Sequence, residues 1–373
     1  MLPDASAWGH AHKLHATVHV VHGDSFQEID LVTDDQTVHT AMHTDPNLLN
    51  PWGVAIGPTG LFWVNDNNSS TFTTGAGVVT IYDANGVSQS AFGHHAISIA
   101  PPMGGTTSTP TGEVFNRFGG FDLAPDKSAL FLFATEDGTI SGWNPQVNAG
   151  SSVLEIDNST TLNGYGVGNQ GEVYKGLAIA HVHGKSFLYA TDFRDGRVEV
   201  YNSQFQPVKS FTDPNVPTDY SPLNVQVLDN HLFVTFAVRN SVGHDDVAGL
   251  GKGFVDEFNF NGTMVARVAS HGPLDSPWGL AIAPKGFGKF AGDLLVGNFG
   301  NGEIHAYDLH TDKLVGVLRD DAGHIIRIGD LWALIPGSNS PGGHPNSLYF
   351  TAGVSEESHG LFGRLTFHHD LHM

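Results

Sequence analysis

Three histidines precede three related segments of the sequence. His43 stands before "NPWGVAI" (50–56), His271 before "SPWGLAI" (276–282) and His324 before "DLWALIP" (330–336). Neutral imidazoles are frequent zinc ligands, and three of them around an open coordination position would let the ion activate water or polarise a carbonyl group. The sequence therefore suggests a transition-metal site on these three histidines. Their chance occurrence in loops is the alternative, because the chain has 22 histidines.

Two glutamates could supply acid and base chemistry. Glu113 and Glu172 lie in the similar phrases "GEVFNRFGG" and "GEVYKGLA", and Arg117 and Lys175 follow them closely. Carboxylates that are close in space can bind calcium or exchange protons, while nearby cations can orient an anionic substrate. We therefore assign these four residues as candidate catalytic groups, with salt bridges among them as the alternative.

Two tryptophans and an asparagine are candidate substrate contacts. Trp52 and Trp278 are each the second residue of a Pro-Trp-Gly phrase, and Asn50 precedes the first of these phrases. Indole rings can form an aromatic floor for a sugar or an aromatic ligand. Core packing is the alternative interpretation of the tryptophans.

The composition limits the possible partners. Lys and Arg number 17 and Asp and Glu 38, so the formal net charge is −21. This argues against nucleic acid and leaves cations and neutral or cationic ligands open. The chain has no cysteine, so a metal must be bound by His, Asp, Glu, Asn or backbone oxygens. No apolar run approaches the roughly 18 to 20 residues of a membrane span, so membrane insertion is not expected. The usual hydrolase, kinase, dinucleotide and zinc-protease motifs are absent.

The Pro-Trp-Gly phrase recurs in weaker copies, which indicates stacked copies of one supersecondary unit. An aromatic-rich run follows each copy, and a further run follows a turn, as in "VVTIYDANG" and "RVEVYNS". Four short strands at a period of about 55 residues predict an all-β, six-bladed β-propeller. The residues that we align with the first tryptophan are Trp52, Gly119 in "RFGGFDLAP" (117–125), Lys175, Leu223, Trp278 and Leu331.

The two ends of the repeat region predict how the ring closes. The sixth unit lacks an outer strand, whereas "FQEIDLVT" (26–33) precedes the first unit and could supply it. An N-terminal strand would then close the ring and remove its exposed sheet edge. We therefore expect one domain over residues 25–367, with flexible His-rich tails at 1–24 and 368–373.

In a propeller, the loop into each innermost strand and the hairpin between the second and third strands surround the same end of the axial channel. The three histidines and both glutamates fall in such predicted loops. The hairpin "VRNSVGHDDVAGLGKG" (238–253) exceeds what a turn needs, so we expect it to cover the channel or bind a cation through Asp245 and Asp246. Turn chemistry is the simpler explanation for "TEDG" (135–138).

Three phrases carry a resemblance to a known family. "HTDPNLLNPWGVAIGPTGLFWVND" (43–66), "GVVTIYDANG" and "SLYFTAGVSEESHGLFGRL" resemble an uncharacterised family of bacterial, mostly exported six-bladed propellers related to NHL-repeat proteins. The resemblance covers roughly residues 26 to 367. It implies an NHL-like fold and a secreted or periplasmic location, with a cytoplasmic one as the alternative. It implies no particular chemistry.

These observations lead to two hypotheses of function. The first is a metal-dependent enzyme, a hydrolase or lyase, that acts on a small molecule at the axial channel. Zinc or another divalent transition metal would be its cofactor, with calcium as the alternative, and Glu113 or Glu172 its acid or base. The second is a non-catalytic propeller that binds a protein, glycan or cation through its acidic face. We expect a monomer in either case.

Overall fold

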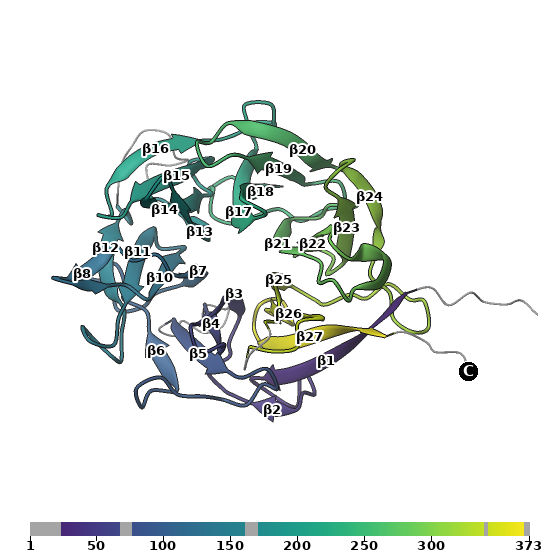
Figure 1. Cartoon of the computed structure of the whole chain (residues 1–373), viewed down its shortest axis with the longest axis horizontal. Coiled ribbons are helices and arrows are strands. Elements are labelled where there is room, and N and C mark those ends of the chain that lie inside the picture. Colours follow the sequence, from purple (N-terminus) through teal and green to yellow (C-terminus); the bar gives the residue numbers. More distant parts are fainter. Residues whose placement is uncertain (1–23, 68–76, 161–170, 339–341, 369–373) are drawn as a thin grey trace, which may run out of the picture.

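The computed structural model describes residues 24–67, 77–160, 171–338 and 342–368. Six antiparallel sheets surround a central axis, which confirms the six-bladed β-propeller (Figure 1). The innermost strands of blades one to six are β3 (Pro51–Ile56), β7 (Pro110–Phe115), β13 (Tyr174–Val182), β17 (Tyr220–Leu228), β21 (Pro277–Ile282) and β25 (Leu331–Pro336). None of the helices in the described ranges is long and apolar enough to cross a membrane.

The remaining strands complete each blade outward from the axis. Blade one continues with β4 (Phe62–Asp66), β5 (Val78–Tyr82) and β6 (Ala96–Ser98), and blade two with β10 (Phe131–Thr135), β11 (Thr139–Trp143) and β12 (Val153–Asp157). Blade three continues with β14 (Lys185–Asp192), β15 (Arg197–Asn202) and β16 (Pro207–Phe211), and blade four with β18 (His231–Val238), β19 (Phe254–Phe258) and β20 (Met264–Ser270). Blade five continues with β22 (Leu294–Asn298), β23 (Ile304–Asp308) and β24 (Lys313–Val317).

An N-terminal strand closes the ring, as predicted. In blade six, β26 (Ser347–Ala352) and β27 (Leu361–His368) are followed by β1 (Ser25–Thr33), which pairs antiparallel with β27. The short strand β2 (His43–Thr44) then pairs parallel with β1 at the outer edge of the sheet. The first and last parts of the described chain therefore share the sheet of blade six, and this pairing closes the ring of blades.

The prediction for the inner strand of blade two is wrong. The structure forms this strand from "PTGEVF" (110–115) and not from "RFGGFDLAP" (117–125), so Thr111, and not Gly119, corresponds to Trp52. The segment 117–125 instead leads into a small hairpin of β8 (Asp122–Ala124) and β9 (Lys127–Ser128). Gly119, Gly120 and Phe121 all have positive φ, which an extended strand does not tolerate.

In blade six the residue that corresponds to Trp52 is Trp332, one position after Leu331, the predicted equivalent. Leu331 pairs with Ala352 as Pro51 pairs with Asp66, so Leu331 takes the place of the proline and Trp332 that of Trp52. The alignment error arose because Leu331 is apolar and precedes a second apolar residue.

The repeated phrase has a packing role. In all six blades the pairing of the first and second strands is interrupted at this position. The backbone carbonyls released there accept hydrogen bonds from the preceding blade, for example Thr351 Oγ1 to Trp52 O at 2.6 Å and Asn224 Nδ2 to Trp278 O at 2.7 Å. Glycine follows because the blades nearly touch: a Cβ on Gly53 would lie 2.4 Å from Thr111 O.

Candidate functional site

Three tryptophans fill the axial channel where the inner strands begin. Trp52 and Trp332 stack with ring centroids 3.5 Å apart, and Trp278 meets them edge-on at 6.4 and 5.9 Å. Their residues are 1 to 2% exposed, because the rings cover one another. We call these three residues the tryptophan plug. Trp52 and Trp278 are therefore channel packing, and neither has an open ring face for the predicted stacking on a ligand.

Charged side chains from four blades gather beside the tryptophan plug. They come from the β10–β11 hairpin, from β13, from the β18–β19 loop and from the β26–β27 loop. All these segments lie at the end of the channel where the inner strands start, which we call the upper mouth. The group, which we call the upper cluster, consists of Glu136, Lys175, His244, Asp245, Asp246 and Glu357.

Lys175 is the buried cation of the upper cluster. It is 2% exposed, forms an ion pair with Glu136, and places Nζ 4.8 Å from the centroid of the Trp52 ring. Burial alone would lower the pKa of Lys175, but the charges of Glu136, Asp245 and Asp246 raise it above its usual value. The lysine therefore stays charged and holds several carboxylates close to the axis.

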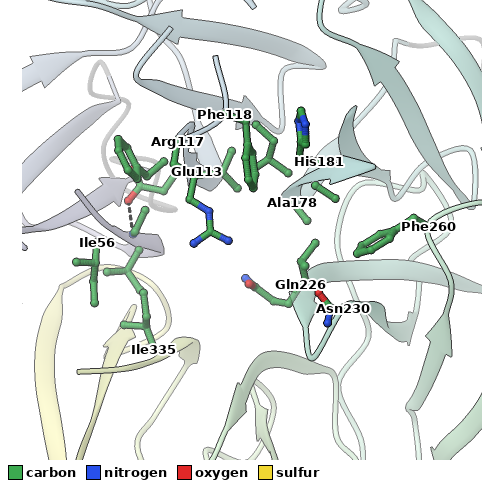
Figure 2. A pocket seen from close by; sticks show the side chains of 17 residues that line it. Ile56, Glu113, Arg117, Phe118, Ala178, His181, Gln226, Asn230, Phe260 and Ile335 are labelled. Atoms are coloured by element: carbon green, nitrogen blue, oxygen red, sulfur yellow. Dashed lines mark hydrogen bonds between the residues drawn. The ribbon is translucent and has the colours of Figure 1, made fainter. Parts of the chain in front are cut away.

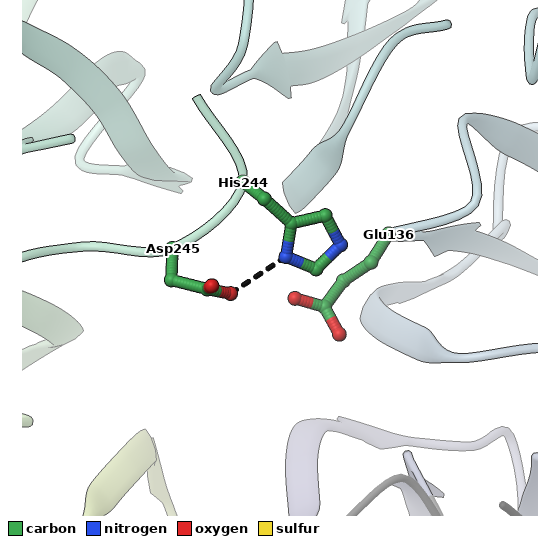
Figure 3. A group of neighbouring side chains, drawn as sticks. All are labelled: Glu136, His244 and Asp245. Carbon is green, nitrogen blue, oxygen red and sulfur yellow. Dashed lines mark hydrogen bonds and ion pairs between the residues drawn. The ribbon is translucent and has the colours of Figure 1, made fainter. Parts of the chain in front are cut away.

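The long insert of blade four brings a second group to this place. Asp275 fixes the insert, because Gly249 N donates to Asp275 Oδ1 at 2.6 Å. His244 Nδ1 and Asp245 Oδ1 are 2.6 Å apart, and these two side chains face Glu136 of blade two (Figure 3). Ligand atoms of all three residues lie within 4.8 Å of one another. The insert thus reaches the channel mouth, where His244 and Asp245 join Glu136 to form a group of one imidazole and two carboxylates.

Glu357 is an acidic residue of the upper cluster whose pKa is raised. Burial raises its pKa to about 7, although the hydrogen bond from Asn50 opposes this shift. Asn50 Nδ2 donates to Glu357 Oε2 at 2.9 Å, and Asn50 Oδ1 accepts from Trp332 Nε1 at 3.2 Å. Asn50 therefore positions Glu357 on the tryptophan plug. A carboxyl group that titrates near neutral pH can serve as acid or base.

The chain was compared with known proteins. No protein-family model matches it. An uncharacterised protein of Acanthamoeba polyphaga mimivirus is 31% identical over 350 residues, which cover 91% of this chain and 80% of the viral protein. This chain belongs to the same family. A second uncharacterised protein of that virus is 30% identical over 338 residues, covering 87% and 82% of the two chains. The family thus has members in a virus, whereas the resemblance of the sequence had implied a bacterial, mostly exported one.

Several solved structures resemble this chain at low sequence identity. A catalytically inactive virginiamycin B lyase from Staphylococcus aureus, solved with quinupristin, has a TM-score of 0.47 and 10% identity and covers 92% of this chain and 99% of the lyase. Hydrazine synthase from Kuenenia stuttgartiensis has a TM-score of 0.49 and 13% identity, with 81% and 74% covered. The Pan2 WD40 domain of Neurospora crassa has a TM-score of 0.44 and 10% identity, with 92% and 96% covered.

The three predicted metal-binding histidines do not come together in this family member. His43 lies on β2 at the outer edge of blade six. His271 Nδ1 is 2.8 Å from Gly251 O, and His324 is largely exposed beside Asp320. Within the described ranges two groups of side chains could hold a metal ion, and neither contains any of the three histidines: Glu136 with His244 and Asp245, and Glu172 with Asp192 and Asp195. The prediction failed because the loops turn away from the axis to different extents.

The two predicted catalytic glutamates lie in different places. Glu172 lies in a buried network between blades two and three, where Arg197 is 3.3 Å from its carboxylate. Burial raises the pKa of Glu172 to about 7. Among the described residues the ion pair of Glu172 is therefore with Arg197, which was not one of the four candidate residues. Glu113 is on the inner strand β7, below the tryptophan plug, and lines the same cavity as Arg117, which follows that strand.

Glu136 and Glu357 were not singled out from the sequence, although a signal was present. Lys175 occupies the position that is Trp, Thr or Leu in the other five inner strands. A lysine in such a buried position needs acidic partners nearby. Acidic residues in the loops at the same end of other blades were the candidates for that pairing.

Proposed function

We propose that this protein is a metal-dependent enzyme, a hydrolase or lyase, that acts on a small molecule at the upper mouth. The observation that carries the proposal is that the side chain of Glu136 in blade two lies close to those of His244 and Asp245 in blade four. One imidazole with two carboxylates suits zinc or another divalent transition metal, and calcium is the alternative because carboxylate oxygens are its usual ligands.

The charge balance of the upper cluster supports a cation. Lys175 is surrounded by the carboxylates of Glu136, Asp245, Asp246 and Glu357. One lysine cannot neutralise them all, and burial raises the pKa of Asp246 and of Glu357. A divalent cation would reduce the remaining repulsion between carboxylates.

Each residue has a role in this proposal. Glu136, His244 and Asp245 would hold the ion, which when bound can polarise a carbonyl group or activate water. Lys175 keeps Glu136 in place through their ion pair. Glu357, with a pKa of about 7, would accept or donate the proton. It takes over the acid and base role that the sequence had suggested for Glu113 or Glu172.

Metal binding is the first test. The full chain, stripped of metal and then dialysed against zinc, manganese or calcium, is expected to retain about one equivalent more than the His244→Ala variant. The difference between these two proteins is the relevant quantity, because exposed histidines elsewhere also bind metal. The matched control is His324→Ala. The His324 side chain is 79% exposed in the loop between blades five and six, and this variant should retain as much metal as the unaltered protein.

Equal metal content in the unaltered protein and His244→Ala would contradict the proposed site. It would favour the second hypothesis, a non-catalytic propeller that binds a protein, glycan or cation through its acidic face. If the site does bind metal, esters, lactones and lyase substrates are the compounds to screen. Activity that requires the metal and is lost in Glu357→Gln would support the enzyme.

The Glu357→Gln variant should also change how stability depends on pH. The pKa of Glu357 is raised from 4.5 to about 7, so the folded protein binds this proton more tightly than the unfolded chain. Its stabilising effect is complete below pH 4.5 and is lost as the pH rises through 7. Relative to the unaltered protein, Glu357→Gln should therefore gain about 2 to 3 kcal/mol between pH 5 and pH 8. Urea denaturation at both pH values measures this gain, and parallel curves would show that Glu357 is ionised throughout.

A further inference from the structure

A second cavity lies on the axis, at the end opposite the upper mouth. Its volume is about 500 Å³, within the range of small-molecule sites (Figure 2). It is lined by the C-terminal parts of β3, β7, β13 and β17 and by Ile335 of β25. Because all inner strands run in the same direction along the axis, these parts lie at the lower end of the channel, away from the upper cluster. We call this space the lower cavity.

Apolar and polar side chains both line the lower cavity. The aliphatic part of the wall includes Val54, Ile56, Ala178, Ile179 and Ile335, which come from three different blades. The polar part consists of Glu113, Arg117, His181, Gln226 and Asn230. An apolar wall with few convergent polar groups is typical of a small-molecule site.

Glu113 is a buried acid with an unused oxygen. It is 5% exposed, and its Oε1 accepts a hydrogen bond from Ala55 N at 2.8 Å. Its Oε2 has no hydrogen-bond partner among the residues that the structure describes. Burial raises the pKa of Glu113 well above its usual value, which favours the protonated form of the carboxyl group. An unpaired hydroxyl group of this kind can donate a hydrogen bond to a ligand oxygen.

Arg117 supplies the positive charge of the lower cavity. Its guanidinium group extends into the open channel, 4.9 Å from the centroid of the Phe118 ring (Figure 2). Across the described part of the chain, no carboxylate forms an ion pair with it. Because no carboxylate of the described residues pairs with Arg117 and burial disfavours the charged form of Glu113, Arg117 gives the cavity a local positive charge although the whole chain has a net charge of −21. The planar guanidinium group is suited to bind a carboxylate through two hydrogen bonds.

We propose that the lower cavity binds a small organic acid, whose carboxylate pairs with Arg117, whose carbonyl or hydroxyl oxygen accepts a hydrogen bond from Glu113, and whose apolar body lies against the aliphatic wall. This second site is independent of the metal-dependent function proposed for the upper mouth. Its residues belong to other parts of the channel, so either proposal can fail without the other.

The test uses a probe that carries all three features, 4-oxo-4-phenylbutanoate, in isothermal titration with the full chain. Its amide lacks the charge, and 4-phenylbutanoate lacks the ketone oxygen. We expect the acid to bind at least tenfold more tightly than the amide, because a charge-assisted pair is lost. The ketone should bind more tightly than 4-phenylbutanoate, because only the ketone accepts from Glu113.

Variants then locate the binding. Arg117→Gln should weaken binding of the acid about tenfold or more and leave the amide unchanged. Glu113→Gln retains both a donor and an acceptor and should preserve the preference for the ketone, whereas Glu113→Leu should remove it. The matched control is Arg327→Gln, an exposed arginine outside the cavity, which should bind as the unaltered protein does. Thermal unfolding confirms that each variant is folded.

Several results would overturn the proposal. They are an amide that binds as well as the acid, an Arg117→Gln variant with unchanged affinity for the acid, and absence of binding of every probe at millimolar concentration. If instead metal binding fails at the upper mouth while the acid binds below, the lower cavity would be the principal ligand site.

Discussion

The Lys175→Met variant is expected to lose about 3 to 5 kcal/mol of folding stability at pH 8, the usual cost of removing one partner from a buried ion pair. Methionine fills a similar volume beside Trp52, so the loss reports on charge and not on a cavity. Without the lysine, the carboxylates of Glu136, Asp245 and Asp246 would lie close together at the channel mouth with no lysine among them. Urea denaturation of the two proteins gives the free energies of unfolding.

The pH dependence distinguishes this cause from a packing defect. Lys175 lowers the pKa values of Asp245 and Asp246, so its loss raises them in the folded state and ionisation of these two groups opposes folding at high pH. Protonation relieves the repulsion, so the difference between variant and unaltered protein should shrink from pH 8 to pH 5. Adding Glu136→Gln to Lys175→Met should restore part of the stability. Lys313→Met, an exposed lysine of β24, is the control and should stay within about 0.5 kcal/mol. A difference that is equal at both pH values would contradict the electrostatic explanation.

The Gly112→Ala variant is expected to cost about 3 kcal/mol, because the inner strands of neighbouring blades leave no room for a methyl group. A Cβ there would lie 2.4 Å from Leu177 N and 2.8 Å from Gly176 C, which are backbone atoms of the next blade. Side-chain rotation cannot relieve such a contact, so blades two and three must move apart. Thermal or urea unfolding measures the loss.

The matched control is Gly329→Ala. A Cβ at Gly329 has no heavy atom within 4 Å, and Gly329 is not among the glycines with positive φ. The two variants make the same chemical change, so a difference between them reflects the contact between blades. Equal stability of Gly112→Ala and Gly329→Ala would mean that the ring expands at little cost.

The sequence predicted most of the fold because a propeller repeats one local pattern. Aromatic runs, turns and the Pro-Trp-Gly phrases mark the blades, and the missing outer strand of the sixth unit indicated closure by residues 26–33. Blade two was misaligned because Glu113 makes "PTGEVF" look polar, while "FGGFDLA" has the apolar pattern of an inner strand. Gly119 and Gly120 in that phrase adopt positive φ, which an extended strand does not tolerate.

The candidate site was less predictable than the fold. The length of the insert made its residues Asp245 and Asp246 candidates for cation binding, and Lys175 was a candidate because it follows Glu172 closely. Their partners Glu136 and Glu357 come from other blades, and the sequence contains no measure of the distance between loops of different blades.

Six repeated four-stranded units, an N-terminal closing strand and the absence of thiolate chemistry follow from local pattern and composition, so they could be predicted from the residues alone. Which loop residues meet depends on the packing of the blades around the axis. Closure of the ring brings Glu136, His244 and Glu357 to one mouth, whereas His43, His271 and His324 stay apart. The repeat in the sequence shows where each loop begins along the chain, whereas the packing between blades determines where the side chains of that loop lie in space.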